Sequence, residues 1–599
     1  MERDHALSAG PTQRQQRAKA PVIQSLRNAQ PSKILATLVV AVCLWFLVVQ
    51  PFGWILFNSA HDDATRTWTL GNYARVLTQP DLVRPILNSL LLATVVAIVS
   101  VALGVPAAWL VTRTDMPARG LVRTLTLAAF VTPSFVGATA WILLGAPNSG
   151  WINQLWRTAT GAEAPLFDIY SMGGAVFVSA IYTVPFTFTI VSSALESMAV
   201  ELEDAATTLG SGTWRTMASI TMPLVMPAVI AGFILSFIQG LTLFGVPAFL
   251  LGPSGVQVVT TRLAELYQQF PPELYLAAAY CLPLLLITAA LFLVRRRILG
   301  RRRFTVVSGK ARGTKRIALK AWRWPALCLA MVVPVTAIVL PYAALLLVSL
   351  SKAWGRGPGW DNLTLDWYAL VLVGNAEMRT AILNSFGFAI AAATLCVLLG
   401  TVIAYLVERR SVRFTGALAG LATLPIVIPG VVLSVGFFAA YAKAPFGLYG
   451  TPWILIAAFS ATFLPIAFTQ GAALIKGISP DLERVARSLG ATEAQAFAAI
   501  TAPLLRNGLV AAWLLVFIPI IRELSVAVFL VTPKTNVMTT LIYNAKDGGN
   551  YETLCAMSVL LVASTIALVA LARLATTGGA RRAGRRAERN ALRTAEALA

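Results

Sequence analysis

The sequence predicts an all-α polytopic membrane protein with about 12 transmembrane helices in two parallel six-helix repeats. Three observations support this fold class. The chain of 599 residues is 57% hydrophobic and only 12% charged. Apolar runs of roughly 20 residues recur along it, and each is long enough to cross the ~30 Å hydrocarbon layer as a helix. Short motifs of the first half also return in the second half in the same order.

Twelve apolar runs are the candidate membrane spans. The first run follows a basic tail and is too long for a signal-peptide core, so we interpret it as an uncleaved helix. None of the runs has the polar and apolar alternation of an outer-membrane barrel. The predicted spans are 34–57, 86–111, 124–145, 174–195, 226–251, 274–294, 324–350, 381–407, 415–441, 453–475, 508–532 and 553–572.

Repeated motifs divide the spans into two sets of six. TLGNY at 69–73 returns as TLDWY at 364–368, and ILNS at 86–89 returns at 382–385. Because each half has an even number of spans, both halves enter the membrane from the same side. The repeats are therefore parallel, and they are expected to enclose a central pathway that neither half lines alone.

These boundaries predict five regions. The two repeats are separated by a polar, basic segment, and basic tails flank them. The regions are a cytoplasmic N-terminal tail at 1–33, the first repeat at 34–294, a cytoplasmic linker at 295–323, the second repeat at 324–572 and a cytoplasmic C-terminal tail at 573–599.

The net charge of +22 raises the question of a nucleic-acid partner. Most of the Lys and Arg residues fall in segments on one side of the predicted membrane, which is the positive-inside bias. We therefore expect anionic lipid beside these residues and no nucleic acid. His5 and His61 lie outside the spans, and no cysteine pair has CxxC spacing, so no metal site is predicted.

Two polar segments stand out in this largely hydrophobic chain. VELEDAATTLG at 200–210 and PDLERVARSLG at 480–490 both begin with acids, continue as helix formers and end at Gly. An amphipathic stretch through Trp214 and Ile220 follows the first. Each segment is therefore expected to form a short helix, a glycine turn and a second short helix. Two interpretations remain open: an amphipathic helix resting on lipid, or a docking helix for a cytoplasmic partner.

The two segments resemble the EAA loop of binding-protein-dependent ABC importer permeases. That pattern is E-A-A, three residues, Gly, nine residues, Ile, one residue and Leu-Pro. The first copy has Asp for Glu and Met for Leu, whereas the second has lost the acid and the Leu. The resemblance implies ATPase docking by Glu203, Asp204, Ala205, Ala206, Gly210, Ile220 and Pro223, and by Glu483, Arg484, Ala486, Gly490, Ile500 and Pro503.

The resemblance covers nearly all of the chain from about 34 to 572 and implies a type I importer fold in the bacterial inner membrane. It implies two copies of a separate cytoplasmic ATPase and a periplasmic substrate-binding protein as partners. No GxxxxGK[ST] pattern occurs, so we expect no enzyme activity and no cofactor on this chain, with ATP and Mg on the partner. The residues Arg522 to Ser525 look most like the ferric-iron branch. Thiamine, phosphonate, sugar-phosphate and polyamine permeases remain alternatives.

Arg522 and Glu523 are the charged pair well inside a predicted span. Such charges mark either a transport pathway or a structural ion pair with a neighbouring helix, and the sequence leaves both open. Several prolines, including Pro133 and Pro429, also fall in mid-span and predict kinks for gating or packing. A twelve-helix secondary transporter is the rival function, since Glu523 could couple to an ion, but it would not need two EAA loops.

Overall fold

The structure is a computed structural model, and it describes residues 31–63, 65–198, 201–300, 316–357, 359–409, 412, 414–546 and 548–570. Within this part of the chain every regular element is a helix, and the only β pairing consists of three isolated bridges. The predicted tails lie largely outside the described residues, as do the linker residues 301–315. Helix α3 (Pro31–Leu44) begins slightly before the predicted first span.

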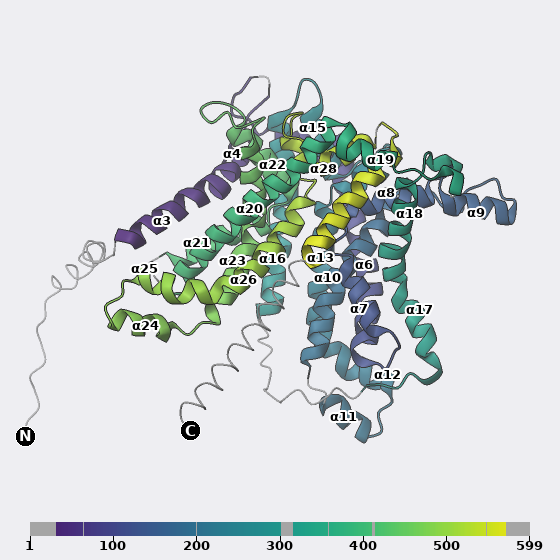
Figure 1. Cartoon of the computed structure of the whole chain (residues 1–599), viewed down its shortest axis with the longest axis horizontal. Coiled ribbons are helices and arrows are strands. Elements are labelled where there is room, and N and C mark those ends of the chain that lie inside the picture. Colours follow the sequence, from purple (N-terminus) through teal and green to yellow (C-terminus); the bar gives the residue numbers. More distant parts are fainter. Residues whose placement is uncertain are drawn as a thin grey trace, which may run out of the picture.

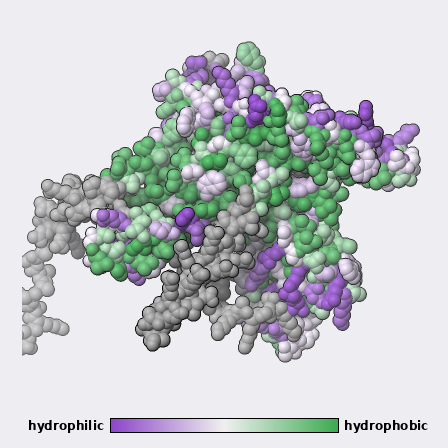
Figure 2. All heavy atoms as spheres, viewed as in Figure 1, coloured by the Kyte–Doolittle hydropathy of each residue, from purple (hydrophilic) through white to green (hydrophobic). Residues whose placement is uncertain are grey.

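The all-α, multi-pass prediction is confirmed. Ten helices of the described chain are long and apolar enough to cross a membrane, and a bent pair makes an eleventh candidate. Hydrophobic side chains cover the middle of the molecule, whereas hydrophilic ones gather at its upper and lower edges (Figure 2). The ten helices are Ile34–Ser59, Pro80–Arg113, Met172–Ser197, Thr213–Thr242, Leu274–Ile298, Lys320–Ser349, Ala376–Glu408, Pro452–Lys476, Phe497–Ile521 and Tyr551–Ala570.

The third predicted span of each half is not one straight helix. In the first half it divides into α7 (Arg119–Ala128) and α8 (Ser134–Gly145). In the second half Thr415–Ile426 and α22 (Gly430–Tyr441) meet at an angle of 110°. Pro133 and Pro429 are the N-caps of α8 and α22, with extended backbone, so these prolines break the spans rather than kinking a continuous helix.

The predicted spans 226–251 and 508–532 are shifted in the structure. Helix α13 (Met222–Thr242) begins within a longer helix from Thr213, because α12 (Thr213–Thr216) and the π-helical turn η2 (Met217–Thr221) run straight into it. The predicted separate second short helix is therefore the first turns of the span.

Both shifted spans also end early, in mid-chain breaks. Helix α13 stops at Thr242 before α14 (Gly245–Leu250), and α26 (Ala502–Ile521) stops before α27 (Ala527–Leu530). A carbonyl in each break accepts a threonine hydroxyl of a following helix, as irregular backbone at membrane depth requires. Thr260 Oγ1 donates to the Leu243 carbonyl at 2.9 Å, and Thr539 Oγ1 donates to the Glu523 carbonyl at 3.0 Å.

The first span of each repeat crosses over to the other repeat. Helix α3 packs against α20 (Ala376–Glu408), and its continuation α4 (Gln50–Ser59) packs against α22. The π-helical turn η1 (Trp45–Val49) between them packs against α23 (Pro452–Lys476) of the same second half. Helices α17 (Arg323–Pro334) and α18 (Leu340–Ser349) pack against α6 (Pro80–Arg113), α7 and α8 of the first half (Figure 1). The two halves therefore interlock.

The repeated ILNS motif has the same structural role in both halves. Its Asn and Ser side chains lie on the second span, where they bind the backbone at the start of α15 (Val259–Gln268) and of α28 (Met538–Ala545). The four bonds are Asn88 Nδ2 to the Gln257 carbonyl at 2.8 Å, Val259 N to Ser89 Oγ at 2.8 Å, Asn384 Nδ2 to the Asn536 carbonyl at 2.9 Å and Met538 N to Ser385 Oγ at 2.7 Å.

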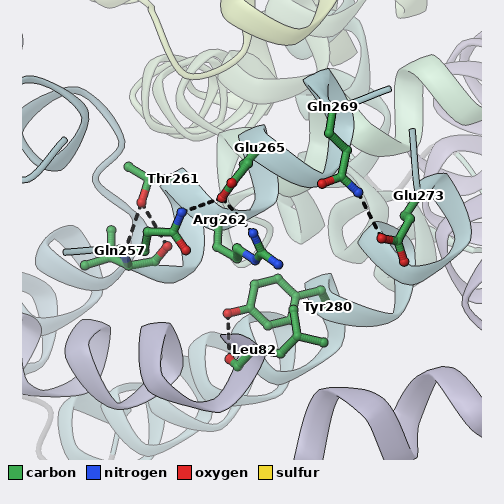
Figure 3. A network of polar contacts seen from close by, with 9 residues as sticks. Leu82, Gln257, Thr261, Arg262, Glu265, Gln269, Glu273 and Tyr280 are labelled. Carbon is green, nitrogen blue, oxygen red and sulfur yellow. Dashed lines mark hydrogen bonds and ion pairs between the residues drawn. The ribbon is translucent and has the colours of Figure 1, made fainter. Parts of the chain in front are cut away.

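Polar contacts lie within α15, between its end and the start of α16 (Leu274–Gly300), and between α16 and α6 (Figure 3). Helix α16 is the last span of the first half. Arg262 Nη1 forms an ion pair with Glu265 at 2.7 Å, and Gln269 Nε2 donates to Glu273 at 2.9 Å. The Tyr280 hydroxyl donates to the Leu82 carbonyl on α6 at 2.8 Å. The Gln269 contact thus joins the end of α15 to the turn before α16, and the Tyr280 contact joins α16 to α6.

Candidate functional site

The first polar segment forms helix α11 (Glu201–Thr208), which ends at Gly210. Gly210 has a φ of 82°, the left-handed conformation that favours glycine. Ser211 N donates to the Ala206 carbonyl at 3.0 Å, and Gly210 N donates to the Thr207 carbonyl at 3.0 Å, which is the bonding of a Schellman cap. The predicted helix and glycine turn are therefore present.

The second polar segment repeats this turn. Helix α24 (Pro480–Ser488) ends at Gly490, whose φ is 94°. Ala491 N donates to the Ala486 carbonyl, and Gly490 N donates to the Arg487 carbonyl, both at 3.1 Å. The spacing of Ala and Gly that the two segments share is therefore the spacing of the cap.

Most of the predicted docking residues are on the outer side of these helices. Asp204, Ala205, Gly210 and Pro223 are exposed, and so are Arg484, Gly490 and Pro503, whereas Ala206, Ala486, Ile220 and Ile500 are half-buried. Large apolar side chains are exposed on the same polar loops: Leu202, Leu209 and Trp214 in the first loop, and Leu482, Val485 and Leu489 in the second. Each loop thus presents an apolar patch among charged groups.

Glu203 points the other way, toward the body of the protein. Its carboxylate accepts a hydrogen bond from Thr221 Oγ1 at 2.7 Å and lies 3.6 Å from Nη1 of Arg113, the last residue of α6. Arg113 is only 2% exposed and also donates to the Leu195 carbonyl at 2.8 Å. Glu203 therefore ties α11 to the end of the second span.

Glu483 forms the equivalent cluster in the second half. It is 6% exposed and accepts hydrogen bonds from Thr501 Oγ1 at 2.5 Å and from the Tyr405 hydroxyl at 3.0 Å. Arg409 Nε lies 3.3 Å from its carboxylate, and Arg409 Nη2 donates to the Ile478 carbonyl at 3.1 Å. Helix α24 is thereby tied to the end of α20.

We call these two clusters the glutamate clamps: Glu203, Arg113 and Thr221 in the first half, and Glu483, Arg409 and Thr501 in the second. Sequence reasoning missed both arginines and both threonines. The repeat itself carried the signal, since Arg409 follows Arg113 by the offset of the early motifs, and Thr501 follows Thr221 by the offset of the polar segments.

Arg522 and Glu523 lie in the break between α26 and α27. Arg522 Nη1 donates to the Phe130 carbonyl in the broken third span of the first half. The Glu523 carboxylate accepts a hydrogen bond from Val526 N at 3.2 Å. Both side chains are half-buried, and Arg522 links the two halves through a backbone carbonyl that the break leaves unpaired.

Helices α15, α22 and α28 lie at the end of the molecule opposite α11 and α24 (Figure 1), and aromatic side chains on them and beside them join the two halves. Rings of one half pack on rings of the other, with centroids 4.7 to 6.3 Å apart, and they leave the halves in contact there. We call this group the aromatic seal; its pairs are Phe244–Phe529, Phe244–Tyr543, Phe249–Tyr543, Tyr267–Phe438 and Tyr267–Phe529.

Known transport permeases are similar in sequence to this chain, two of them over most of its length. The ferric transport system permease protein FbpB of Actinobacillus pleuropneumoniae is 28% identical over 551 residues, which is 91% of this chain and 78% of the relative. A putative ferric transport system permease protein FbpB 1 of Haemophilus influenzae is 28% identical over 84% of this chain and 79% of its own length. A putative 2-aminoethylphosphonate transport system permease protein PhnV of Salmonella paratyphi A is 30% identical over 38% of this chain and 86% of its own length.

The model of one protein family matches the chain twice. The matched residues are 100–304 and 397–584, so each half carries one copy, and each copy contains one of the two polar helices and its glutamate clamp residue. The chain belongs to the family of binding-protein-dependent transport system inner membrane components and is a multi-pass ABC importer permease with two fused halves.

Proposed function

We propose that this permease imports ferric iron, which a periplasmic binding protein delivers and two copies of a cytoplasmic ATPase drive across the membrane. The two relatives named as ferric permeases support the substrate, since each aligns over more than three quarters of its length. In this proposal both termini, the linker and the two polar loops face the cytoplasm.

The paired helices α11 and α24 carry the proposal. They end in the same glycine cap, expose large apolar side chains, and are clamped to equivalent spans. Figure 1 shows them at the lower edge, α24 under the second half and α11 under the first. One ATPase subunit docked under each helix would cover both apolar patches. A helix that only rests on lipid would not need a second, equivalent helix in the other half.

In this proposal the glutamate clamps transmit the movement of the ATPase subunits to the transmembrane helices. When the two ATPase subunits close, the docked helices move toward each other, and the clamps pull the ends of α6 and α20 with them. The aromatic seal then opens on the outer side, because the halves rock as bodies about their interlocked first spans. Nucleotide and Mg act on the partner subunits, and this chain performs no chemistry.

The pathway offers few ligands for a ferric ion. Fe³⁺ prefers carboxylate and other hard oxygen ligands, and Glu523 is the carboxylate beside the break of α26. We propose weak binding there and tight selection in the binding protein. Uptake by Glu523→Gln tests this, because Gln keeps an acceptor for Val526 N while losing the charge. Unchanged uptake kinetics at an unchanged protein level would remove Glu523 from the pathway.

A phosphonate is the second candidate substrate, because the 2-aminoethylphosphonate relative is the most identical of the three and Arg522 offers a cation at the same break. Thiamine, sugar phosphate and polyamine lack such an observation. The deciding experiment is to purify the binding protein encoded beside this chain and identify its ligand, and then to measure uptake of radiolabelled ferric iron and phosphonate in cells with and without the permease.

Copurification tests the mechanism separately from the substrate. We expect an ATPase encoded beside this chain to copurify with it, and ATP hydrolysis to be needed for uptake. Transport that persists without ATP and follows the proton gradient would instead favour a secondary transporter. A permease whose Leu209 and Leu489 are both replaced by Asp should lose the ATPase, since both side chains are more than four fifths exposed.

A further inference from the structure

A pocket of about 370 Å³ lies beside the first glutamate clamp. The end of α6, the first turns of α7 and the end of α10 (Met172–Ser197) form its walls. Arg316, at the start of the chain segment that leads into the second half, also lines it. The site joins the first half to the chain segment that begins the second.

The pocket is strongly basic. Arg113, Arg119, Arg123 and Arg316 line it, against a single acidic side chain, Glu196. Glu196 is neutralised by Arg123 at 2.7 Å. Glu203, outside the lining, pairs with Arg113. Even after these two pairs are set aside, Arg119 and Arg316 leave the pocket with two positive charges that no acidic side chain in the described chain balances.

Arg113 also has an unused donor. Its side chain is 2% exposed, and its Nε finds no acceptor among the described residues, although both terminal nitrogens are engaged. A buried guanidinium N–H without a partner is costly, and an acceptor in the pocket would satisfy it.

Backbone bonds hold Arg316 at the pocket. Ile317 N donates to the Arg113 carbonyl at 2.9 Å, and Asp115 N donates to the Ile317 carbonyl at 3.1 Å. The Asp115 carboxylate accepts a hydrogen bond from Leu319 N at 2.9 Å and pairs with Arg323, and the Arg323 contact lowers the pKa of Asp115. Arg316 is therefore part of a built structure.

In the described part of the second half, the positions equivalent to Arg119 and Arg123 carry no basic side chain. By the repeat offsets, Thr415 and Ala419 stand where the first half has Arg119 and Arg123, and Lys476 stands in place of Glu196. Lys476 pairs with Glu408 at 3.3 Å instead. Among the described residues, the two arginines of α7 that line the basic pocket therefore occur in the first half alone.

The geometry points to a binding site for a phosphate group, presented by an anionic phospholipid headgroup or by a free phosphate ester. Arginine guanidinium groups fit phosphate oxygens in pairs, and basic pockets between helices at the cytoplasmic side of a membrane take anionic headgroups. Leu121 on α7, between Arg119 and Arg123, is 53% exposed, so the helix that forms the wall also offers an apolar contact to an acyl chain.

Occupation of the site would act on the docking helix. A phosphate that accepts a hydrogen bond from Arg113 Nε competes with Glu203 for the same guanidinium, and Glu203 holds α11. The bound anion would therefore adjust the first clamp alone, which gives the two docking helices unequal responses to the membrane. This binding site is independent of which substrate the permease imports.

Native mass spectrometry of the purified full-length chain tests the site, with phosphatidylglycerol as the probe and phosphatidylcholine as the neutral lipid. The test variant is Arg119→Gln with Arg316→Gln. The matched control is Arg296→Gln with Arg297→Gln, which removes the same charge from two exposed residues at the end of α16. If each arginine that lines the pocket contributes about fivefold through contact with the bound phosphate, the test variant should bind phosphatidylglycerol about thirtyfold more weakly. The control should bind it like the wild type, because neither of its arginines lines the pocket.

The outcomes of this experiment distinguish a lipid headgroup from a free phosphate ester as the source of the bound phosphate. Retention of phosphatidylglycerol by the wild type and the control, without displacement by inorganic phosphate, assigns a lipid headgroup. Displacement by inorganic phosphate or glycerol phosphate assigns a free phosphate ester. Equal affinity of all three proteins, or equal loss in both variants, overturns the site. If the test variant is less stable, the thermal stabilisation that phosphatidylglycerol gives each protein makes the same comparison.

Discussion

Replacing Glu483 with Gln should release helix α24 from the end of α20. Thr501 and Tyr405 donate to different oxygens of Glu483, so the single amide oxygen of Gln keeps an acceptor for only one of them. Gln also cannot neutralise Arg409, whose side chain is only 12% exposed. Removing one member of a buried ion pair costs about 3–5 kcal/mol. Because Arg409 keeps its bond to the Ile478 carbonyl, we expect a smaller cost of about 2–3 kcal/mol.

Hydrogen exchange measures this cost directly. Amides of α24 that exchange by local opening should exchange about 30 to 150 times faster in the Glu483→Gln protein. The matched control is Asp481→Asn on the same helix. Asp481 is 72% exposed, and its ion pair with exposed Arg484 is a surface contact worth about 0.5 kcal/mol. It also accepts a hydrogen bond from the exposed Ser479 hydroxyl at 3.2 Å.

The functional consequence follows from the clamp. A docking helix that no longer holds α20 should still bind the ATPase, so ATP hydrolysis should continue while uptake per ATP falls. If Glu483→Gln and Asp481→Asn show the same exchange rates and the same uptake per ATP as the wild type, the clamp does not transmit movement. Glu203→Gln with Glu201→Gln as its control repeats the test in the first half, where Glu201 is exposed.

Three further predictions address other parts of the structure. Gly210→Val should cost about 1–2 kcal/mol and lower uptake per ATP, because φ is 82° there, whereas Gly212→Val in the same loop, at φ −69°, should not. Phe244→Ala should weaken the aromatic seal by about 1–3 kcal/mol over two ring contacts and raise ATP hydrolysis in the absence of binding protein; unchanged basal hydrolysis would contradict this. Because the contact with Arg323 lowers the pKa of Asp115, the stabilisation by that pair is present above about pH 4 and lost as pH falls below it. Thermal stability measured across this range should therefore drop in the wild type more than in Asp115→Asn.

Sequence reasoning was strongest where a pattern depends only on the chain's own periodicity. Apolar runs long enough for a bilayer predicted the helices, and the repeat predicted two equivalent halves. Spacing within one helix and its cap also sufficed for α11 and α24, since a Schellman cap needs only a glycine at a fixed distance from the helix. The start of the span that contains α13 was less well predicted, because the sequence of its polar, amphipathic first turns fits a separate surface helix equally well.

The same reasoning failed at the breaks in the spans. Hydropathy could not show that 226–251 and 508–532 contain a turn, because a broken helix and a continuous one are equally apolar. Such a break is stable only where other groups form the hydrogen bonds that its backbone loses, and those groups lie on other helices. In those two breaks the partners are Thr260 and Thr539, 16 or 17 residues further along the chain. In the broken third spans they come from the other half: Thr288 donates to the Val427 carbonyl at 2.8 Å, and Arg522 donates to the Phe130 carbonyl.

The sequence by itself determined that this protein is helical, crosses the membrane many times, is built twice over and carries one capped polar helix in each half. Only the tertiary structure decided that the first spans exchange halves, that Glu203 and Glu483 face inward to Arg113 and Arg409, and that four arginines meet in one pocket. The reason is physical: periodicity and capping are local to the chain, whereas the direction in which a charged side chain points depends on which distant residue offers it a partner.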